Sequence, residues 1–192
     1  MKEIEIQSTT FNMVMKMLNN FRATDDSRPV LKKVYCKAEK NKIIFVAING
    51  FIASKITINY TNEELEPFDF VFHPFKVDED KRGLNTIKIK YSDDFITFIY
   101  KDKELNEITK KVKNFHEDFI NYNNVVNHDV ERIKIAIDNN LLLKALNSLK
   151  NSKNKTIMLE FTNNPTQPIL IENSLLELGQ AECIVLPIRL MR

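Results

Sequence analysis

Carboxylate side chains are the first candidates for chemistry in this sequence. Two carboxylates can divide general acid and general base catalysis between them, provided that a cleft and a third group hold them in place. Acidic residues are adjacent at positions 78–80 and again at positions 93–94. Both places fall in expected loops, where carboxylates are usually solvated. We therefore expect neither group to be catalytic.

Histidine, cysteine and glycine patterns give no further candidate for catalysis. His73, His116 and His128 are far apart, and none has a partner at metal-ligand spacing. Cys36 and Cys183 each lie in an alternating apolar stretch and are expected to be reduced core residues. Three glycines are too few for a phosphate-cradling loop, and no nucleophile elbow is present. The sequence predicts a protein that is not an enzyme and carries no metal or cofactor.

Charge and hydropathy set further bounds on function. The 192 residues include 28 basic and 26 acidic side chains, a formal net charge of +2, and 43% are hydrophobic. Such a chain can bury a core, but a nucleic-acid role would require its basic residues to gather on one face. The N-terminus lacks a signal-peptide pattern, and no apolar run is long enough to span a bilayer. We expect a cytoplasmic protein.

The first third of the chain has the pattern strand, helix and three strands. Residues 3–7 alternate as a strand, and the hydroxyls of residues 8–10 could cap a helix whose apolar residues recur at spacings of three and four over 11–21. Three strands are then expected, the last two flanking the hairpin signal Asn49-Gly50, at residues 30–38, 42–48 and 51–60.

The middle third repeats this order with a weaker helix. Residues 74–84 are a poor helix candidate, so the second helix is expected to be short or degenerate. Strands are expected around it at residues 68–72, 86–91, 95–100 and 107–112.

The last third is the cleanest copy. Residues 132–137 alternate as a strand, Asp138 or Asn139 caps a helix with a leucine stripe, and strands are expected at 156–161, 169–172 and 181–189. The chain is predicted to be an α+β protein of about three βαβββ half-domain repeats. We expect a domain of two halves over 1–115, a linker over 116–130 and a third half over 131–192.

Three segments resemble the bacterial DNA polymerase sliding clamp (beta subunit) family. Residues 27–34, Ser-Arg-Pro-Val-Leu-Lys-Lys-Val, and residues 47–53 look like the family's Arg-Pro-Val-Leu strand and Thr-Asp-Gly-His-Arg-Leu hairpin. Residues 118–126 are similar to its interdomain segment, and residues 185–190 to its Met-Pro-Met-Arg-Leu ending. The resemblance implies the DNA-clamp fold, with helices inside and sheets outside, in a shortened member. Its richness in Asn, Lys and Ile suits a phage or mobile element of an AT-rich host.

The resemblance also implies a pocket for linear motifs of partner proteins. Taken singly, its residues would be ordinary core, but binding pockets are also mostly apolar clefts at a domain junction. Phe51 and Ile52 replace the family's His-Arg pair, so a different peptide preference is expected. Carried over by position, the pocket would consist of Ile48, Gly50, Phe51, Ile52, Ile120, Val125, Leu186, Pro187, Ile188, Arg189 and Leu190.

A DNA-facing group of basic residues follows from the same resemblance. Lysines off a helical stripe are usually a solvated face, so only the group carries weight. Contacts to phosphates carry no sequence information and so permit sliding. The group consists of Lys16, Arg22, Arg28, Lys144, Lys150, Lys153 and Lys155.

The function implied is that of a sliding clamp, or processivity factor. A homo-oligomeric ring, a tetramer in our expectation, would encircle duplex DNA and tether a DNA polymerase or other replication proteins. The alternative is a clamp-derived interaction protein that does not encircle DNA and modulates or competes with a host clamp. The short chain and the near-neutral charge favour that alternative.

Overall fold

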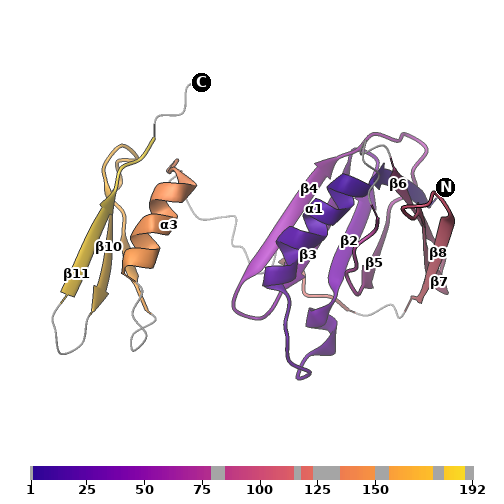
Figure 1. Ribbon diagram of the computed structural model, residues 1–192, viewed down its shortest axis with the longest axis horizontal. Helices are drawn as coiled ribbons and strands as arrows, with labels where there is room; N and C mark the ends of the chain where they lie inside the picture. The colour runs from indigo at the N-terminus through magenta and orange to yellow at the C-terminus, as the bar shows by residue number, and fades with distance from the viewer. Residues whose placement is uncertain are drawn as a thin grey trace. The chain divides into compact units, whose positions relative to one another are not determined.

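The computed structural model describes residues 2–78, 85–114, 118–122, 135–149, 156–174 and 180–188. The chain forms two compact units, residues 1–127 and residues 128–192 (Figure 1). Helices and antiparallel sheets occur in both units, so the protein belongs to the α+β class.

The first unit begins with strand β1 (Glu3–Gln7) and helix α1 (Ser8–Leu18). The helix forms because Phe11, Val14 and Leu18 fall on one face, and all three are fully buried. A short 3₁₀ turn, η1 (Asn19–Phe21), extends it. The predicted hydroxyl cap is wrong: Ser8 is the first helical residue, and no side chain caps the N-terminus. The amide of Ser8 instead donates to the carbonyl oxygen of Asn85 at 2.8 Å.

The expected strand at 30–38 is wrong in its first part. Residues Pro29–Lys32 form a second 3₁₀ turn, η2, and strand β2 begins only at Val34. The ring of Pro29 fixes its backbone in a helical conformation at the first position of the turn. The guanidinium of Arg22 donates to the carbonyl oxygen of Lys32, which holds this turn against the end of the first helix.

Two four-stranded sheets exchange strands between the halves of this unit. The first has the order β4-β3-β2-β5 and the second has the order β1-β6-β7-β8, all antiparallel. Strand β1 therefore leaves its own half to pair with β6, and β5 leaves the second half to pair with β2. The strands are β2 (Val34–Glu39), β3 (Lys42–Ile48), β4 (Ala53–Asn59), β5 (Phe68–Phe72), β6 (Thr86–Tyr91), β7 (Phe95–Lys101) and β8 (Glu107–Lys113).

An extended segment stands where the second half would place its helix. Residues 73–78 follow β5 without regular secondary structure, and residues 79–84 lie outside the described residues. The described part of the segment agrees with the expected degeneration of this helix. Phe75 takes over part of the packing, since its ring lies 5.0 Å from that of Phe98 and 5.4 Å from that of Phe11.

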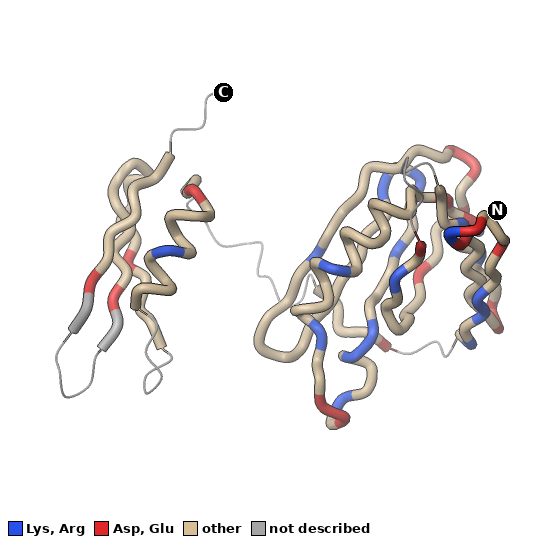
Figure 2. The backbone as a smooth tube through the Cα atoms, viewed as in Figure 1, with Lys and Arg blue, Asp and Glu red and all other residues tan. Residues whose placement is uncertain are grey.

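The core of the first unit joins both sheets and α1. Alternate residues of each strand point inward, as the period of two requires, and the inward set includes Cys36 and Ile89, both fully buried. Aromatic rings from α1, β5 and β7 form its centre. Figure 2 shows basic and acidic residues interspersed along the backbone of this unit.

The second unit is a single half-domain. Helix α3 (Asn139–Ser148) packs on a three-stranded antiparallel sheet of order β11-β10-β9. Asp138 caps the helix as predicted, because its carboxylate accepts from the amides of Asn140 and Leu141. The expected strand at 132–137 is not a strand over its described residues, 135–137. The sheet consists of β9 (Met158–Glu160), β10 (Ile169–Ser174) and β11 (Gln180–Val185).

Candidate functional site

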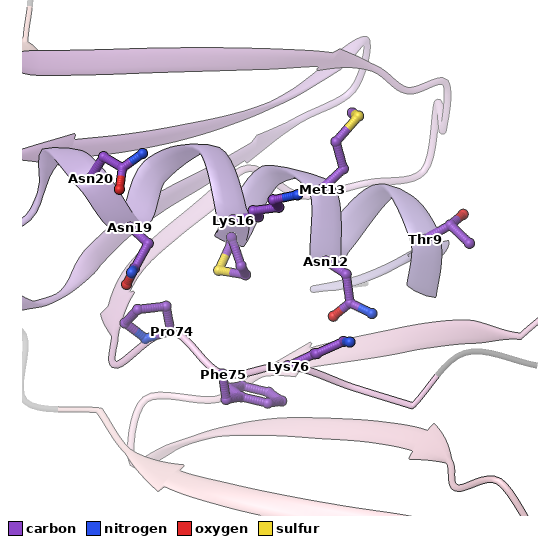
Figure 3. Close-up of a pocket in the computed structure, with 10 residues that line it drawn as sticks. Thr9, Asn12, Met13, Lys16, Asn19, Asn20, Pro74, Phe75 and Lys76 are labelled. Carbon is purple, nitrogen blue, oxygen red and sulfur yellow. The ribbon is translucent and has the colours of Figure 1, made fainter.

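A groove runs along α1 beside the extended segment 73–78 (Figure 3). It has a volume of about 830 Å³, and its walls are the exposed side of α1 and residues 74–76. Asn12 closes its floor: its side-chain amide hydrogen-bonds the backbone of Val77 in both directions, at 2.8 and 3.0 Å. The groove therefore exists because an extended chain, thinner than a helix, lies beside α1.

Two lysines line this groove, and a third contacts an aromatic ring in its wall. Lys16 lies on α1 and Lys76 on the extended segment, and both line the groove. Lys110 lies on β8, with its ammonium 3.9 Å from the centroid of the Phe75 ring, which also lines the groove. A cation over an aromatic face is held by the ring's negative quadrupole. These positive charges on the helix-bearing side could contact phosphates without reading bases.

Two of these lysines were missed in the sequence. Lys76 falls in the segment that failed as a helix, so no periodicity assigned it to a face. Lys110 carried a usable signal, because it alternates on β8 with Ile108 and Val112 and therefore shares their inward face. It also pairs across the sheet with the buried Phe98.

The other predicted DNA-facing residues have varied positions. Arg22 is partly buried and bonded to the Lys32 carbonyl and the Asn19 side chain, and burial lowers the pKa of its guanidinium. Arg22 therefore connects the two 3₁₀ turns, η1 and η2, by hydrogen bonds. Arg28 is exposed just before η2, and Lys144 is exposed on α3 in the second unit. Lys150, Lys153 and Lys155 lie outside the described residues.

The hairpin between β3 and β4 presents an exposed aromatic side chain. Its loop has four residues, because the side-chain oxygen of Asn49 accepts from the amides of Phe51 and Ile52 at 2.9 and 3.0 Å. The expected strand at 51–60 accordingly begins at Ala53. Gly50 has a φ of 98°, which a residue with a side chain adopts only with strain. The loop leaves Phe51 98% exposed and Ile52 half exposed.

Residues 118–122 lie across the face of the first sheet that α1 does not cover. The ring of Phe119 stacks on Tyr35 with centroids 5.5 Å apart, and the ammonium of Lys55 lies 5.6 Å from the Tyr122 ring. Together with the sheet these residues enclose a groove of about 460 Å³, to which Ile120 contributes. Ile48 follows Ile44 and Val46 on this same face of β3 but is itself buried.

Ionisable groups on this face have shifted pKa values. Burial, with Asp69 close by, raises the pKa of the Tyr35 hydroxyl. Glu39 accepts from Lys37 and pairs with Lys42, at 2.7 and 3.2 Å, and these cations lower the pKa of its carboxyl. At neutral pH the Tyr35 hydroxyl is therefore protonated and the Glu39 carboxyl is ionised.

The tail of the second unit lies beside α3. The amide of Ile188 donates to the carbonyl oxygen of Ala136 at 2.9 Å, which fixes the chain after β11. Leu186 lines a groove of about 490 Å³ with Lys144 and Ile184. Leu186 and Ile188 are exposed, and Pro187 is partly buried.

The predicted pocket residues thus fall into two sets. The structure brings Ile48, Gly50, Phe51 and Ile52 together on one hairpin and places Ile120 over the same sheet. Leu186, Pro187 and Ile188 form the other set, in the second unit. The meeting of the two sets in one pocket stays a prediction. Val125, Arg189 and Leu190 lie outside the described residues.

Within the described ranges, no three His, Cys, Asp or Glu side chains gather as metal ligands would. No helix in the same ranges has the length and apolar character needed to cross a membrane.

The fold is that of a bacterial DNA polymerase sliding clamp, over about half of a clamp chain. The clamp of Bacillus subtilis superimposes with a TM-score of 0.73 at 13% identity, over 96% of this chain and 49% of that one. A clamp of Pseudomonas aeruginosa gives 0.74 at 16% identity, over 97% and 51%. The DNA polymerase III beta subunit of Thermotoga maritima gives 0.73 at 14% identity, over 97% and 50%.

Sequence comparison adds nothing to this structural likeness. Neither the protein-family models nor the curated proteins give a match. The chain spans about half the length of the clamps it matches. At these identities the likeness establishes the fold alone.

Proposed function

We propose that this protein is a DNA sliding clamp that encircles duplex DNA as a homo-oligomeric ring. The observation that carries the proposal is the fold: nearly the whole chain superimposes on clamps from several bacteria. The groove along α1 supports it, because Lys16, Lys76 and Lys110 gather there although the net charge is only +2. No step of this function requires a chemical reaction.

The length of the chain determines the proposed assembly. A clamp ring built from chains twice as long needs twice as many of the present chains. The resemblance implies a ring of about twelve half-domains, so chains with about three each close it as a tetramer. Contacts of the lysines with phosphates would then let the closed ring slide, because they are independent of base sequence.

The hairpin and the tail are the proposed attachment site for partner proteins. Phe51 is a large apolar side chain that no contact within its unit covers, and a hydrogen-bonded loop holds it in place. Aromatic anchors of this kind carry much of the energy in protein interfaces. Leu186 and Ile188 supply the apolar surface of the tail. A ring holding a polymerase by such a site raises the polymerase's effective concentration at the template.

A topological experiment tests the ring. The intact protein is assembled on nicked circular DNA, washed at high salt, and then the circle is linearised with a restriction enzyme. A ring is retained on the circle and slides off the linear molecule, because salt removes phosphate contacts but not topology. Negative-stain images of the same sample should show closed rings. Compact particles in the images, together with equal loss of protein from circular and linear DNA, contradict the proposal.

A second experiment tests attachment. Primer extension by a bacterial replicative polymerase is measured with the wild-type chain, with Phe51→Ser, and with Leu186→Glu combined with Ile188→Glu. Shorter products with these variants support the site. Leu105→Glu is the matched control, since Leu105 is also an exposed apolar residue but lies in the β7–β8 loop. Equal product length with all variants contradicts the attachment site.

The alternative is a clamp-derived protein that binds partners of a host clamp without enclosing DNA. The interspersed basic and acidic residues along the backbone of the first unit favour it (Figure 2), as does the net charge of only +2. In the topological experiment this protein would be lost from circles at high salt. In primer extension it would inhibit a host clamp instead of replacing it.

A further inference from the structure

In the first unit, each half pairs one edge of its sheet with a strand from the other half. Each half contains a three-stranded meander, β2-β3-β4 or β6-β7-β8, and each meander opens with a strand that has a partner on its outer edge. Strand β5 of the other half pairs with β2, and β1 pairs with β6. The inward side chains of these opening strands, such as Cys36 and Ile89, are fully buried as a result.

The second unit has the same meander, but its opening strand is paired on one edge only among the described strands. Strand β9 pairs with β10 on one side, and no other strand in the described part of the chain pairs with it. Leu159 lies opposite the fully buried Ile171 and therefore points to the helix-bearing face, yet it remains 45% exposed. Phe161, two residues further on the same face, is 54% exposed.

Helix α3 adds an apolar residue to this open flank. Leu141 lines the groove on the β11 side of the helix together with Ile184 and Leu186. Leu143 lies about 200° further around the helix and so faces the opposite flank, above β9. Its side chain is 55% exposed. A strand edge that has no partner among the described strands, and that is bordered by the exposed Leu143, Leu159 and Phe161, is suited to pairing with another strand.

We propose that β9 pairs antiparallel with β9 of a second copy of this chain. A two-fold axis perpendicular to the sheet would join the two meanders into one sheet of order β11-β10-β9-β9-β10-β11, with both α3 helices on the same face. With the axis at Leu159, the two Leu159 side chains would face each other, and Phe161 of each copy would lie opposite Ile157 of the other, which is the reciprocal pairing that a two-fold axis gives.

A second copy is the occupant that the fold itself indicates. In the first unit, a half-domain is covered by another half-domain, through an antiparallel strand and inward apolar side chains. In the described part of the segment before α3, the carbonyl oxygen of Ala136 accepts from the Ile188 amide, so this residue is bonded to the tail of its own unit. Direct pairing of the two opening strands needs no such exchange and leaves neither β9 edge open.

The β9–β9 contact would be one of the interfaces in the proposed oligomer. It rests on that proposed function but does not require that the oligomer encloses DNA. The test is the mass of the full chain in solution, measured by native mass spectrometry over a range of concentrations. Leu159→Glu should raise the dissociation constant by more than about tenfold, because it places a charge in a desolvated apolar contact. The variant should then be a monomer, or a dimer where the wild type is a tetramer.

Ile184→Glu is the matched control, since Ile184 is 66% exposed on β11, at the opposite flank of the same sheet. It should leave the mass unchanged. A wild-type chain that is monomeric at every concentration, or a Leu159→Glu variant that associates like the wild type, overturns the proposal. So does equal disruption by Ile184→Glu.

Hydrogen exchange on the wild-type protein covers the case in which Leu159→Glu does not fold. Amides of residues 158–160 should become more protected as concentration rises, while those of the exposed hairpin loop should not change. Protection that is independent of concentration overturns the proposal. Loss of DNA retention with β9 protection intact would instead count against the proposed ring alone.

Discussion

The side chain of Asn12 hydrogen-bonds both backbone polar groups of Val77. Its Nδ2 donates to the carbonyl oxygen at 2.8 Å, and its Oδ1 accepts from the amide at 3.0 Å. Both bonds are buried, and they join α1 to a segment 65 residues further along the chain. A side chain thus satisfies backbone groups that a helix would have satisfied internally. These two hydrogen bonds fix the position of the segment on which Phe75 and Lys76 line the groove.

Replacing Asn12 with Ala should destabilise the protein. The substitution leaves the amide and the carbonyl of Val77 buried without this partner, which costs about 1–3 kcal/mol per unsatisfied group. Urea unfolding of the intact chain measures the loss. Asn20→Ala is the control, because Asn20 is exposed at the end of the same helical segment and should change stability by less than about 0.5 kcal/mol. Equal effects of the two substitutions would deny the Asn12–Val77 pair its structural role.

The amphipathic segments were predictable because their signals are local. The stripe from Phe11 to Leu18 and the cap at Asp138 are each decided by a few neighbouring residues, and both helices form there. The strand exchange was not predictable in this way. Alternation shows that residues 3–7 form a strand, but it does not show whether that strand pairs within its own half or, as found, with β6.

The candidate surfaces were predictable only in part. The family resemblance pointed to the hairpin at Gly50, and the structure gives the reason for its shape in the Asn49 side chain. Lys76 could not be assigned, since its neighbours follow no period. The single pairing of β9 among the described strands also carries no local signal, because the pairing of a strand depends on the whole half-domain.

Raising the pH above about 10, where a tyrosine in the unfolded chain loses its proton, should destabilise the first unit through Tyr35. Burial beside Asp69 raises the pKa of the Tyr35 hydroxyl in the folded chain. The stability that the protonated Tyr35 hydroxyl contributes is therefore fully present below the unfolded pKa. It is lost as pH rises through the folded pKa, because over that range the unfolded chain binds fewer protons than the folded chain.

Tyr35→Phe should reduce this alkaline loss. The Phe ring can still stack on Phe119, so the groove under residues 118–122 should persist. Urea unfolding at a series of pH values from neutral to alkaline gives the slope of stability against pH. Tyr122→Phe serves for comparison, because Tyr122 lies on the same face at the Lys55 ammonium. An unchanged slope in Tyr35→Phe would contradict the assignment.

Gly50→Ala should destabilise the hairpin through the backbone alone. An added Cβ would meet no atom within 4 Å, so no clash contributes, but φ is 98°. Positive φ costs a residue with a side chain about 1–2 kcal/mol. Thermal unfolding followed by circular dichroism measures this cost. Phe51→Ser, at a side chain that is 98% exposed, should leave stability within about 0.5 kcal/mol of the wild type.

Neutralising the lysines of the groove should weaken DNA binding and its dependence on salt. Replacing Lys16, Lys76 and Lys110 with Gln removes charges that we propose to contact phosphates, and each lost contact lowers the slope of log affinity against log salt by about 1. Fluorescence anisotropy with a labelled duplex over a range of salt concentrations gives both quantities. The matched triple control consists of Lys37, Lys55 and Lys111. These residues lie on the faces of the two sheets that point away from α1 and the core. If the control triple lowers affinity and slope as much as the groove triple, DNA does not use the helix-bearing face, and the proposed path of DNA past α1 is wrong.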